Sequence, residues 1–292
     1  MVEHVIQQNP GMFTRTELAR YLGIARSSLY YVPLQQQKDW ETKIAIEQVL
    51  HAYPSYGHKR IALHLGRNKK RILRVMHIYG IQPYRRRGLK PRKKQDEKTT
   101  PAPYENLLIR IPFPHQPGIV WVSDFTHIRF KNKWVYLATV MDLYTRVIVG
   151  WHVLTSHHVE LVRGAAAHAL SHHAPPKILH SDQGSEYKSK QYTEYVEKQN
   201  IAISMSRKSS PWENGYQESF YSEFKVDLGD PGRYESLGEL IAAIHATVNS
   251  YNNSRIHTSL RMPPMKFFQQ YIERSKLLSS DAVTNVSEER GT

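Results

Sequence analysis

The sequence contains no cysteine, and this absence excludes three kinds of chemistry. Disulfide bonds, thiol nucleophiles and cysteine-ligated zinc sites all require a residue that this chain does not have. A bound metal ion must therefore rest on carboxylates or histidines. The histidine pairs at 157–158 and 172–173 are poor candidates, because adjacent residues of a helix point to different faces. We interpret them as surface residues and predict no zinc site.

Long apolar runs are also missing. Hydrophobic residues make up 40% of the 292 residues but occur in short stretches, none of them near the roughly 20 residues needed to cross a bilayer. The opening residues, MVEHVIQQNP, are polar and lack the apolar segment of a secretory signal. We therefore expect no membrane partner and predict a cytoplasmic protein.

Acidic residues are scarce in the first third of the chain, where basic residues are abundant. Residues 1–100 hold 20 Lys and Arg against 7 Asp and Glu, whereas residues 101–292 hold 20 against 19. The whole chain has a formal net charge of +14 and a pI of about 9.7. A basic run is most often a solvated surface, but charge divided this unevenly favours an attached nucleic-acid-binding region.

Helical patterns fill this basic first third. The segment 14–32 predicts a helix, a turn at Gly23 and a second short helix. This is the outline of a helix-turn-helix, although a plain helical hairpin fits these residues equally well. Three more helices are predicted at 41–53, 58–65 and 69–81. The candidate DNA-binding residues on their polar faces are Lys59, Arg60, Lys70 and Arg71.

A short, strongly basic run follows these helices. Of the ten residues at 85–94, seven are basic and none is acidic. Gly88, Pro91 and the polar residues beyond them are typical of a flexible tether. The run adds three candidate DNA-binding residues, namely Arg85, Arg86 and Arg87.

The pattern changes after Gly118 to short apolar runs rich in Val, Ile, Thr and aromatic residues. They predict three successive strands, at 119–124, 133–142 and 146–156, joined by tight turns. Helices and strands then alternate. The later elements are predicted as strands at 177–182 and 201–206 and as helices at 159–173, at 190–200, from about 213 and from 236. This order predicts a mixed sheet with helices packed on it.

Three carboxylates stand where these elements begin or end. Asp124 closes the predicted strand 119–124, where an inward-facing carboxylate is costly to desolvate without a partner such as a metal ion. Asp182 repeats the arrangement, with Gly184 behind it to turn the chain sharply. Glu218 lies on the helix after a polar loop. Each acid alone has an ordinary structural explanation, but together they offer the hard oxygen ligands that magnesium or manganese prefers.

The spacing of the three acids makes the pattern specific. Asp124 and Asp182 are separated by 57 residues, and Asp182 and Glu218 by 35. In this order of strands and helices, the chain resembles the DDE transposases and retroviral integrases. The motifs WVSDFTHI, HSDQGSEY, ENGYQESF and YNNSRIHTSLRMPPMKF carry the same resemblance.

Two N-terminal motifs narrow the resemblance. RSSLYYV and SYGHKRI are similar to the helical modules encoded by the second reading frame of IS three family insertion sequences. Retroviral integrases carry a His-His-Cys-Cys zinc module, which a chain without cysteine cannot build. The bacterial branch is therefore favoured.

The resemblance spans residues 14–270 and implies the fold and its division into domains. It implies an α/β fold with an RNase H-like core, a mixed five-stranded sheet with helices on both faces, preceded by all-α helix-turn-helix modules. The expected domains are a helix-turn-helix module at 1–36, a second helical DNA-binding module at 37–86, a basic linker at 87–112, an integrase-like catalytic core at 113–275 and a polar, disordered tail at 276–292.

The resemblance also implies the activity of a DNA transposase. Asp124, Asp182 and Glu218 would then be the catalytic residues and the ligands of two Mg²⁺ or Mn²⁺ ions, which promote cleavage at the ends of the element and strand transfer. The implied partners are double-stranded DNA, at element ends and target, and further copies of the chain. Whether an upstream-frame protein joins or is fused on stays open. The implied location is the bacterial cytoplasm, in association with the nucleoid.

Other residues are expected near the three acids. Lys225 follows Glu218 by seven residues, which places it about 20° from the same helix face and within reach of a phosphate. His180 lies two residues before Asp182 on the same strand face, and we interpret it as supporting the site, with simple packing as the alternative. The remaining expected residues are Gly184 and Asn214 as support and Trp212, for which core packing and base stacking are equally open.

Two other functions share parts of this pattern. An RNase H-like nuclease without strand transfer would keep the carboxylates but would not need basic modules that bind element ends. A DNA-binding regulator derived from a transposase would keep the basic modules and lose an acid. The chain has both its basic first third and all three acids, which favours the transposase.

Overall fold

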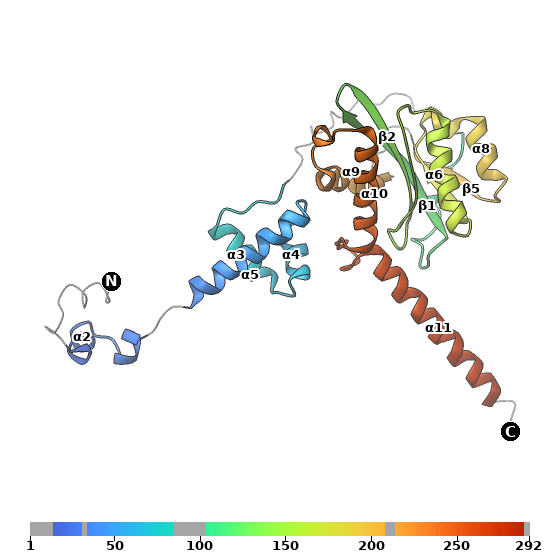
Figure 1. Ribbon diagram of the computed structural model, residues 1–292. Coiled ribbons are helices and arrows are strands. Elements are labelled where there is room, and N and C mark those ends of the chain that lie inside the picture. The colour runs from blue at the N-terminus through green and yellow to red at the C-terminus, as the bar shows by residue number, and fades with distance from the viewer. Residues whose placement is uncertain (1–13, 31–33, 85–102, 208–213, 289–292) are drawn as a thin grey trace.

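The chain folds into a helical N-terminal part and an α/β part built on one five-stranded sheet (Figure 1). The computed structural model describes residues 14–30, 34–84, 103–207 and 214–288. Arg85, Arg86, Arg87 and Trp212 lie outside these ranges. Among the described helices, none combines the length and apolar character of a membrane span.

The first helix begins where its sequence signal predicts. Thr14 caps α2 (Arg15–Tyr21) because its hydroxyl accepts the Glu17 N–H. The Thr14 N–H donates to the Glu17 carboxylate at 2.8 Å, which completes a capping box. Gly23 then turns the chain at φ 65°. The second short helix is η1 (Arg26–Tyr30), a 3₁₀ helix of five residues.

Three helices around a small apolar core form the second helical unit. They are α3 (Gln35–Ala52), α4 (His58–His64) and α5 (Lys69–Ile78). Ile46, Tyr56 and Ile72 are fully buried between them, and Ile256 from the C-terminal region completes the same cluster. A residue from outside the three helices thus belongs to the core of this unit.

Helix α3 begins at Gln35, earlier than the predicted start at residue 41. Its first turn is held by polar contacts that hydrophobic periodicity does not reveal. Gln35 donates to the Asp39 carboxylate at 2.8 Å, and Arg74 of α5 donates to the same carboxylate at 2.8 Å. The ion pair between Arg74 of α5 and Asp39 thus supports the additional first turn of α3.

The sheet has the order β3-β2-β1-β4-β5. Strands β1, β2 and β3 are antiparallel neighbours, whereas β4 and β5 run parallel to β1. The strands are β1 (Val120–Phe130), β2 (Lys133–Asp142), β3 (Ile148–Leu154), β4 (Ile178–Ser181) and β5 (Ala202–Met205). The five predicted strands are confirmed, together with their mixed directions.

One strand boundary is wrong in a way that affects the site. The sequence predicts that the first strand ends at Asp124, but β1 continues to Phe130. The residues beyond Asp124 keep an alternating pattern, with Ile128 and Phe130 buried and Arg129 exposed, and they pair with β2. Asp124 therefore lies inside a strand, opposite Thr139 of β2.

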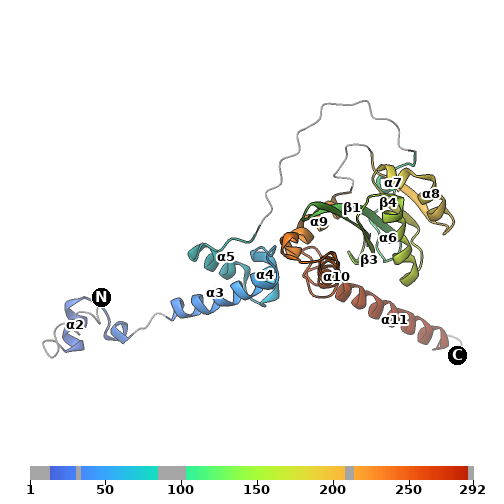
Figure 2. The same cartoon turned by 45° about the horizontal axis from the view of Figure 1, so that its top comes forward.

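Helices cover both faces of the sheet (Figures 1 and 2). On one face, β1 and β2 pack against α9 (Gly215–Leu228) and α10 (Leu237–Asn253). On the other face, the sheet packs against α6 (Val159–His172) and α8 (Lys190–Glu197), with α7 (Ser185–Lys188) between β4 and α8. This is the predicted α/β, RNase H-like architecture.

Two domain boundaries differ from the prediction. Residues 103–112, expected in the linker, pack on the sheet through η2 (Leu107–Ile109), where the Leu107 N–H donates to Ser204 at 2.9 Å. The tail expected to be disordered from 276 instead continues α11 (Pro264–Glu288). No proline or glycine follows Pro264 before Gly291, so neither of the two strong helix breakers interrupts this stretch. Figure 1 shows α11 extending away from the sheet.

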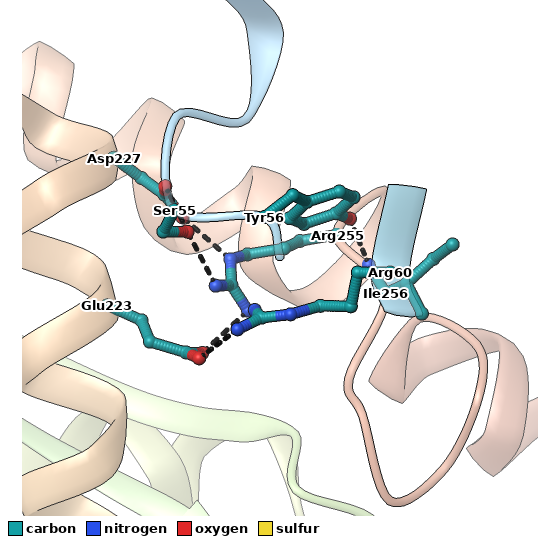
Figure 3. Close-up of polar contacts among 7 residues, drawn as sticks. All are labelled: Ser55, Tyr56, Arg60, Glu223, Asp227, Arg255 and Ile256. Atoms are coloured by element: carbon teal, nitrogen blue, oxygen red, sulfur yellow. Dashed lines mark hydrogen bonds and ion pairs between the residues drawn. The ribbon is translucent and has the colours of Figure 1, made fainter. Parts of the chain in front are cut away.

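A cluster of charges joins the second helical unit to α9 (Figure 3). Arg255, whose side chain is 3% exposed, pairs with Glu223 at 2.8 Å and with Asp227 at 2.6 Å. Arg60 of α4 also pairs with Glu223, and the Ile256 N–H donates to the hydroxyl of Tyr56 at 2.6 Å. Burial alone would raise the pKa of Glu223, but the charges of Arg255 and Arg60 outweigh it, and its pKa is lowered.

We predict that Arg255→Ala lowers the free energy of unfolding by roughly 3 to 5 kcal/mol, because two acids would be left in a largely buried site without their partner. Lys43→Ala is the matched control. It removes the solvent-facing Lys43–Glu47 pair of α3 and should cost less than about 1 kcal/mol. Urea unfolding followed by circular dichroism measures both. Equal losses in the two variants would contradict the assigned role of Arg255.

Candidate functional site

Asp124 occupies the point where the sheet opens. Its strand pairs with β4 only over Val120–Val122, so the neighbour on that side has ended when β1 reaches Asp124. The Asp124 side chain is partly buried, and its Oδ1 accepts the Phe125 N–H at 2.8 Å. The carboxylate thus lies on the sheet face that α9 covers, beside the end of β4.

Asp182 directly follows β4, and Gly184 fixes its carboxylate. The Gly184 N–H donates to Asp182 Oδ1 at 2.9 Å. Gly184 has φ −54°, which any residue adopts, so conformational freedom is not why glycine stands here. A Cβ at this position would lie 3.1 Å from Asp182 Oδ1 and 3.2 Å from Glu186 Oε2. A side chain here would therefore crowd both carboxylates, which would have to move by a few tenths of an ångström.

Glu218 is exposed in the first turn of α9, and two neighbours that the sequence analysis missed anchor this helix. Gln217 donates to the Val122 carbonyl at 2.7 Å, and the Tyr221 hydroxyl donates to the Asp124 carbonyl at 2.6 Å. Thr139 of β2 donates to Gln217 Oε1 at 3.0 Å. The signal was present, because residues 217 and 221 share one helix face through their i, i+4 spacing.

The charges of the other two acids act on Asp124. Burial is the largest cause that raises the pKa of Asp124, the charges of Asp182 and Glu218 add to it, and the Phe125 N–H and Lys225 oppose it, with a net result of about 7. Burial also raises the pKa of Asp182, and the Glu186 carboxylate adds to this effect. The charges of both other acids therefore reach Asp124, as they would in a set of ligands for a cation.

The donor set suits a hard divalent cation, although it is not fully gathered. Within the described ranges, no three His, Asp or Glu side chains are grouped closely enough to hold a metal ion. Asp124 and Asp182 are held by backbone N–H groups, whereas Glu218 is exposed. The charges of Asp182 and Glu218 help to raise the pKa of Asp124, and a bound divalent cation would relieve this repulsion. The three carboxylates therefore fit a hard divalent cation.

Two residues expected to support the site are buried beside it. His180 is fully buried, and its Nδ1 lies 2.8 Å from the hydroxyl of Ser204, so it ties β4 to β5. Asn214 is buried at the N-terminal end of α9 but makes no capping hydrogen bond with its side chain.

The candidate DNA-binding residues fall into two groups. Lys59 and Lys70 are exposed, as a contact with DNA requires, and Lys225 lies partly buried on α9. Arg60 and Arg71 have partners within the protein. Arg60 pairs with Glu223, and Arg71 donates to the Lys38 carbonyl at 3.0 Å and to Thr42 at 2.9 Å. The structure gives these two arginines a role in packing that their basic character alone does not reveal.

Comparisons with known proteins identify the family. Two models described as integrase core domain match residues 114–211 and 199–264. The transposase for insertion sequence element IS904 of Lactococcus lactis is 32% identical over 249 residues, which cover 82% of this chain and 98% of that protein. The chain belongs to the transposases of bacterial insertion sequences.

Further relatives and solved structures resemble this transposase. The InsF transposase for insertion sequence IS3A of Escherichia coli K12 is 31% identical, over 60% of this chain and 64% of its own length. The simian T-cell lymphotropic virus intasome has a chain with 17% identity and a TM-score of 0.49, covering 75% of the transposase and 73% of that chain. The HTLV-2 integrase catalytic core in complex with magnesium has 17% identity and a TM-score of 0.45. The match covers 53% of the transposase and 98% of that chain.

Membership of this family establishes the substrate of the transposase, which is DNA. The transposase is a polynucleotidyl transferase with an integrase-like catalytic core. The transposase activity predicted from the sequence is thereby confirmed. The core model at 114–211 contains Asp124 and Asp182, and the model at 199–264 contains Glu218.

We predict an unusual pH dependence for the metal-free transposase. The pKa of Asp124 is about 7 when folded, against an ordinary 3.8, so the folded chain holds a proton that the unfolded chain releases. The contribution of Asp124 to the free energy of unfolding is therefore full below about pH 4 and is lost as the pH rises through about 7. In chelator, Asp124→Asn should gain stability relative to the unsubstituted chain as the pH is raised.

Asp39→Asn is the control of opposite sign. The hydrogen bond from Arg74 lowers the pKa of Asp39, so its contribution is present at neutral pH and is lost as the pH falls. Asp39→Asn should thus be the less stable chain near pH 7 and approach the unsubstituted chain in acid. Differential scanning calorimetry across pH measures both variants. A pH-independent difference for Asp124→Asn would show that this carboxylate is not desolvated and repelled as described.

Proposed function

We propose that the transposase cuts the ends of its insertion sequence and joins them to target DNA with Asp124, Asp182 and Glu218 as the ligands of two divalent metal ions. One observation carries the proposal. The charges of Asp182 and Glu218 both raise the pKa of Asp124, although the three acids come from different elements of the fold. A cluster of like charges beside an opening in the sheet is costly unless a cation is bound there.

The chain's own groups prepare this site. Asp124 is held by the Phe125 N–H and Asp182 by the Gly184 N–H, so both carboxylates are oriented before any ligand arrives. Glu218 is exposed and joins them when DNA and metal are bound. Gln217 and Tyr221 fix the helix that carries it against β1. The bound Mg²⁺ or Mn²⁺ ions supply activation of the attacking oxygen and stabilisation of the leaving oxygen.

Two in-line displacements then account for the reaction. In the first, the oxygen of a water molecule attacks a phosphodiester at the element end, the bond to the 3′ oxygen breaks, and a free 3′-OH remains. In the second, that 3′-OH attacks a phosphodiester of the target, a new phosphodiester forms, and one target strand leaves with its own 3′-OH. No protein nucleophile is required, and Lys225 holds the phosphate backbone of the DNA end near the acids.

The helical units supply binding to the element ends. Lys59 and Lys70 are exposed on them, and the basic run after Tyr84 links them to the core in the sequence. Phosphate contacts of this kind give affinity that falls as salt is raised. Assembly of several copies on DNA, and addition of an upstream-frame protein, would bring two element ends together within the bacterial nucleoid.

We predict that Asp124→Asn, Asp182→Asn and Glu218→Gln each abolish cutting and joining but leave DNA binding nearly intact, because the loss of one ligand disturbs both metal positions. The measurement is cleavage and strand transfer of a labelled element end with Mg²⁺, beside a gel-shift assay. Glu160→Gln is the control, since this acid is exposed on α6, on the other face of the sheet.

The same assay separates the alternatives. Near-normal strand transfer by any of the three variants would remove that residue from the proposed site. An unsubstituted chain that cuts without joining would be an RNase H-like nuclease. One that binds ends without cutting them would be a DNA-binding regulator.

A further inference from the structure

Arg146 lies in the turn between β2 and β3, in a backbone conformation that arginine rarely adopts. Its φ is 65°, in the left-handed region that favours glycine, and its N–H donates to the Asp142 carbonyl at 2.9 Å. A glycine would form this turn with less strain. We therefore expect the side chain of Arg146 to contribute something that outweighs the strain of its backbone.

The side chain of Arg146 is buried without an acid to neutralise it. The residue is 8% exposed, and its Nη1 atom is buried with no hydrogen-bond partner in the described part of the chain. Among the ion pairs of the described residues, none includes Arg146. Burial of a charge is unfavourable when the charge is unpaired. This turn therefore combines backbone strain with an unpaired buried cation.

Two aromatic rings cover the guanidinium of Arg146. Its central carbon lies 4.0 Å from the centroid of the Tyr216 ring and 5.4 Å from that of the Phe113 ring. The two rings are themselves neighbours, with centroids 6.4 Å apart. Phe113 belongs to the segment before β1, and Tyr216 is the second residue of α9. Because a planar guanidinium stacks on aromatic faces, Arg146 joins these two segments to the turn between β2 and β3.

The contact at Tyr216 attaches α9 at a second side. Gln217 and Tyr221 hold one face of the helix against β1. A helix attached along one face can still rotate about that line. Successive residues are about 100° apart around the helix axis, so the contact at Tyr216 lies beside this face and opposes the rotation. Glu218 is exposed, and the rotation of α9 decides where its carboxylate points.

We propose that Arg146 is a positioning residue for Glu218, which it holds in place by stacking on Tyr216 at the start of α9. The proposal rests on the proposed function, because it takes Glu218 to join the two aspartates as a metal ligand. In this role Arg146 contacts neither the metal ions nor the DNA. Loss of its side chain should therefore slow the chemical steps and leave DNA binding unchanged.

The test is Arg146→Gly in the full chain, assayed with a labelled element end and Mg²⁺. Glycine suits the left-handed backbone, so this variant should have an unfolding midpoint close to that of the unsubstituted chain. Strand transfer at saturating DNA should be slower by about 10- to 100-fold, while the affinity for the end stays within about twofold. Arg146→Lys keeps the charge but not the planar group, and should recover only part of the rate.

Arg261→Gly is the matched control. Arg261 also lies in the left-handed region, with φ 61°, and its N–H donates to the His257 carbonyl at 2.8 Å, as the N–H of Arg146 does to Asp142. Its side chain is exposed instead of buried. The two glycine variants therefore make the same change to the backbone, and only Arg146→Gly should slow strand transfer. Equal rates in the two variants would overturn the proposal.

Tyr216→Leu tests the same contact from the side of the helix, and does so even if Arg146→Gly folds poorly. Tyr216 is 41% exposed, so loss of its ring should not unfold the chain. This variant should slow strand transfer as Arg146→Gly does. The double variant should be no slower than either single variant, because all three lack the same contact. Additive losses would show that the two residues act separately, which would contradict the proposal.

Hydrogen exchange separates this proposal from the proposed function. In the metal-free chain, Arg146→Gly should speed the exchange of backbone amides in the first two turns of α9 and leave those of α6 unchanged. If Glu218→Gln transfers strands normally, the proposed function fails, and the exchange result still decides whether Arg146 holds α9. If Glu218→Gln is inactive but Arg146→Gly transfers strands at the full rate, the positioning role fails alone.

Discussion

The burial of the Asp124 carboxylate beside the charges of Asp182 and Glu218 is the constraint on which the candidate site depends. A chain gains nothing in stability from bringing carboxylates together, so other contacts must hold them there. The sheet does this for the two aspartates, because β1 and β4 are parallel neighbours and each carboxylate accepts a local N–H group. Holding these carboxylates together lowers the stability of the fold, and a bound cation would offset this cost by neutralising their charge.

Helix α9 connects the separate parts of this transposase. On one side of the helix, Gln217 and Tyr221 donate hydrogen bonds to carbonyl groups of β1. On another side, Glu223 and Asp227 form ion pairs in the charge cluster at the second helical unit. Glu218 lies between these two attachments. A helix period of 3.6 residues lets one segment serve all three purposes.

The sequence predicts the α/β architecture well, because apolar runs and turns report sheets and helices directly. It fails where the cause lies in tertiary contacts. The true end of β1 depends on pairing with β2, and Arg60 serves packing only because Glu223 faces it in the fold. The crowding that a side chain at Gly184 would meet comes from the carboxylates of Asp182 and Glu186, which no local pattern records. The sequence analysis did not name Gln217, although its i, i+4 spacing to Tyr221 predicts that both side chains lie on one face of the helix.

Binding of Mn²⁺, followed by calorimetry and by electron paramagnetic resonance, tests the shared carboxylate site most directly. With a DNA end present, the unsubstituted transposase should bind two Mn²⁺ ions per chain, and Asp124→Asn should bind none at comparable concentration. Glu218→Gln should weaken the binding, and more so with DNA than without it, because the exposed Glu218 joins the set only on DNA. Binding of Mn²⁺ that is the same in all three chains would contradict the assignment of these acids as metal ligands.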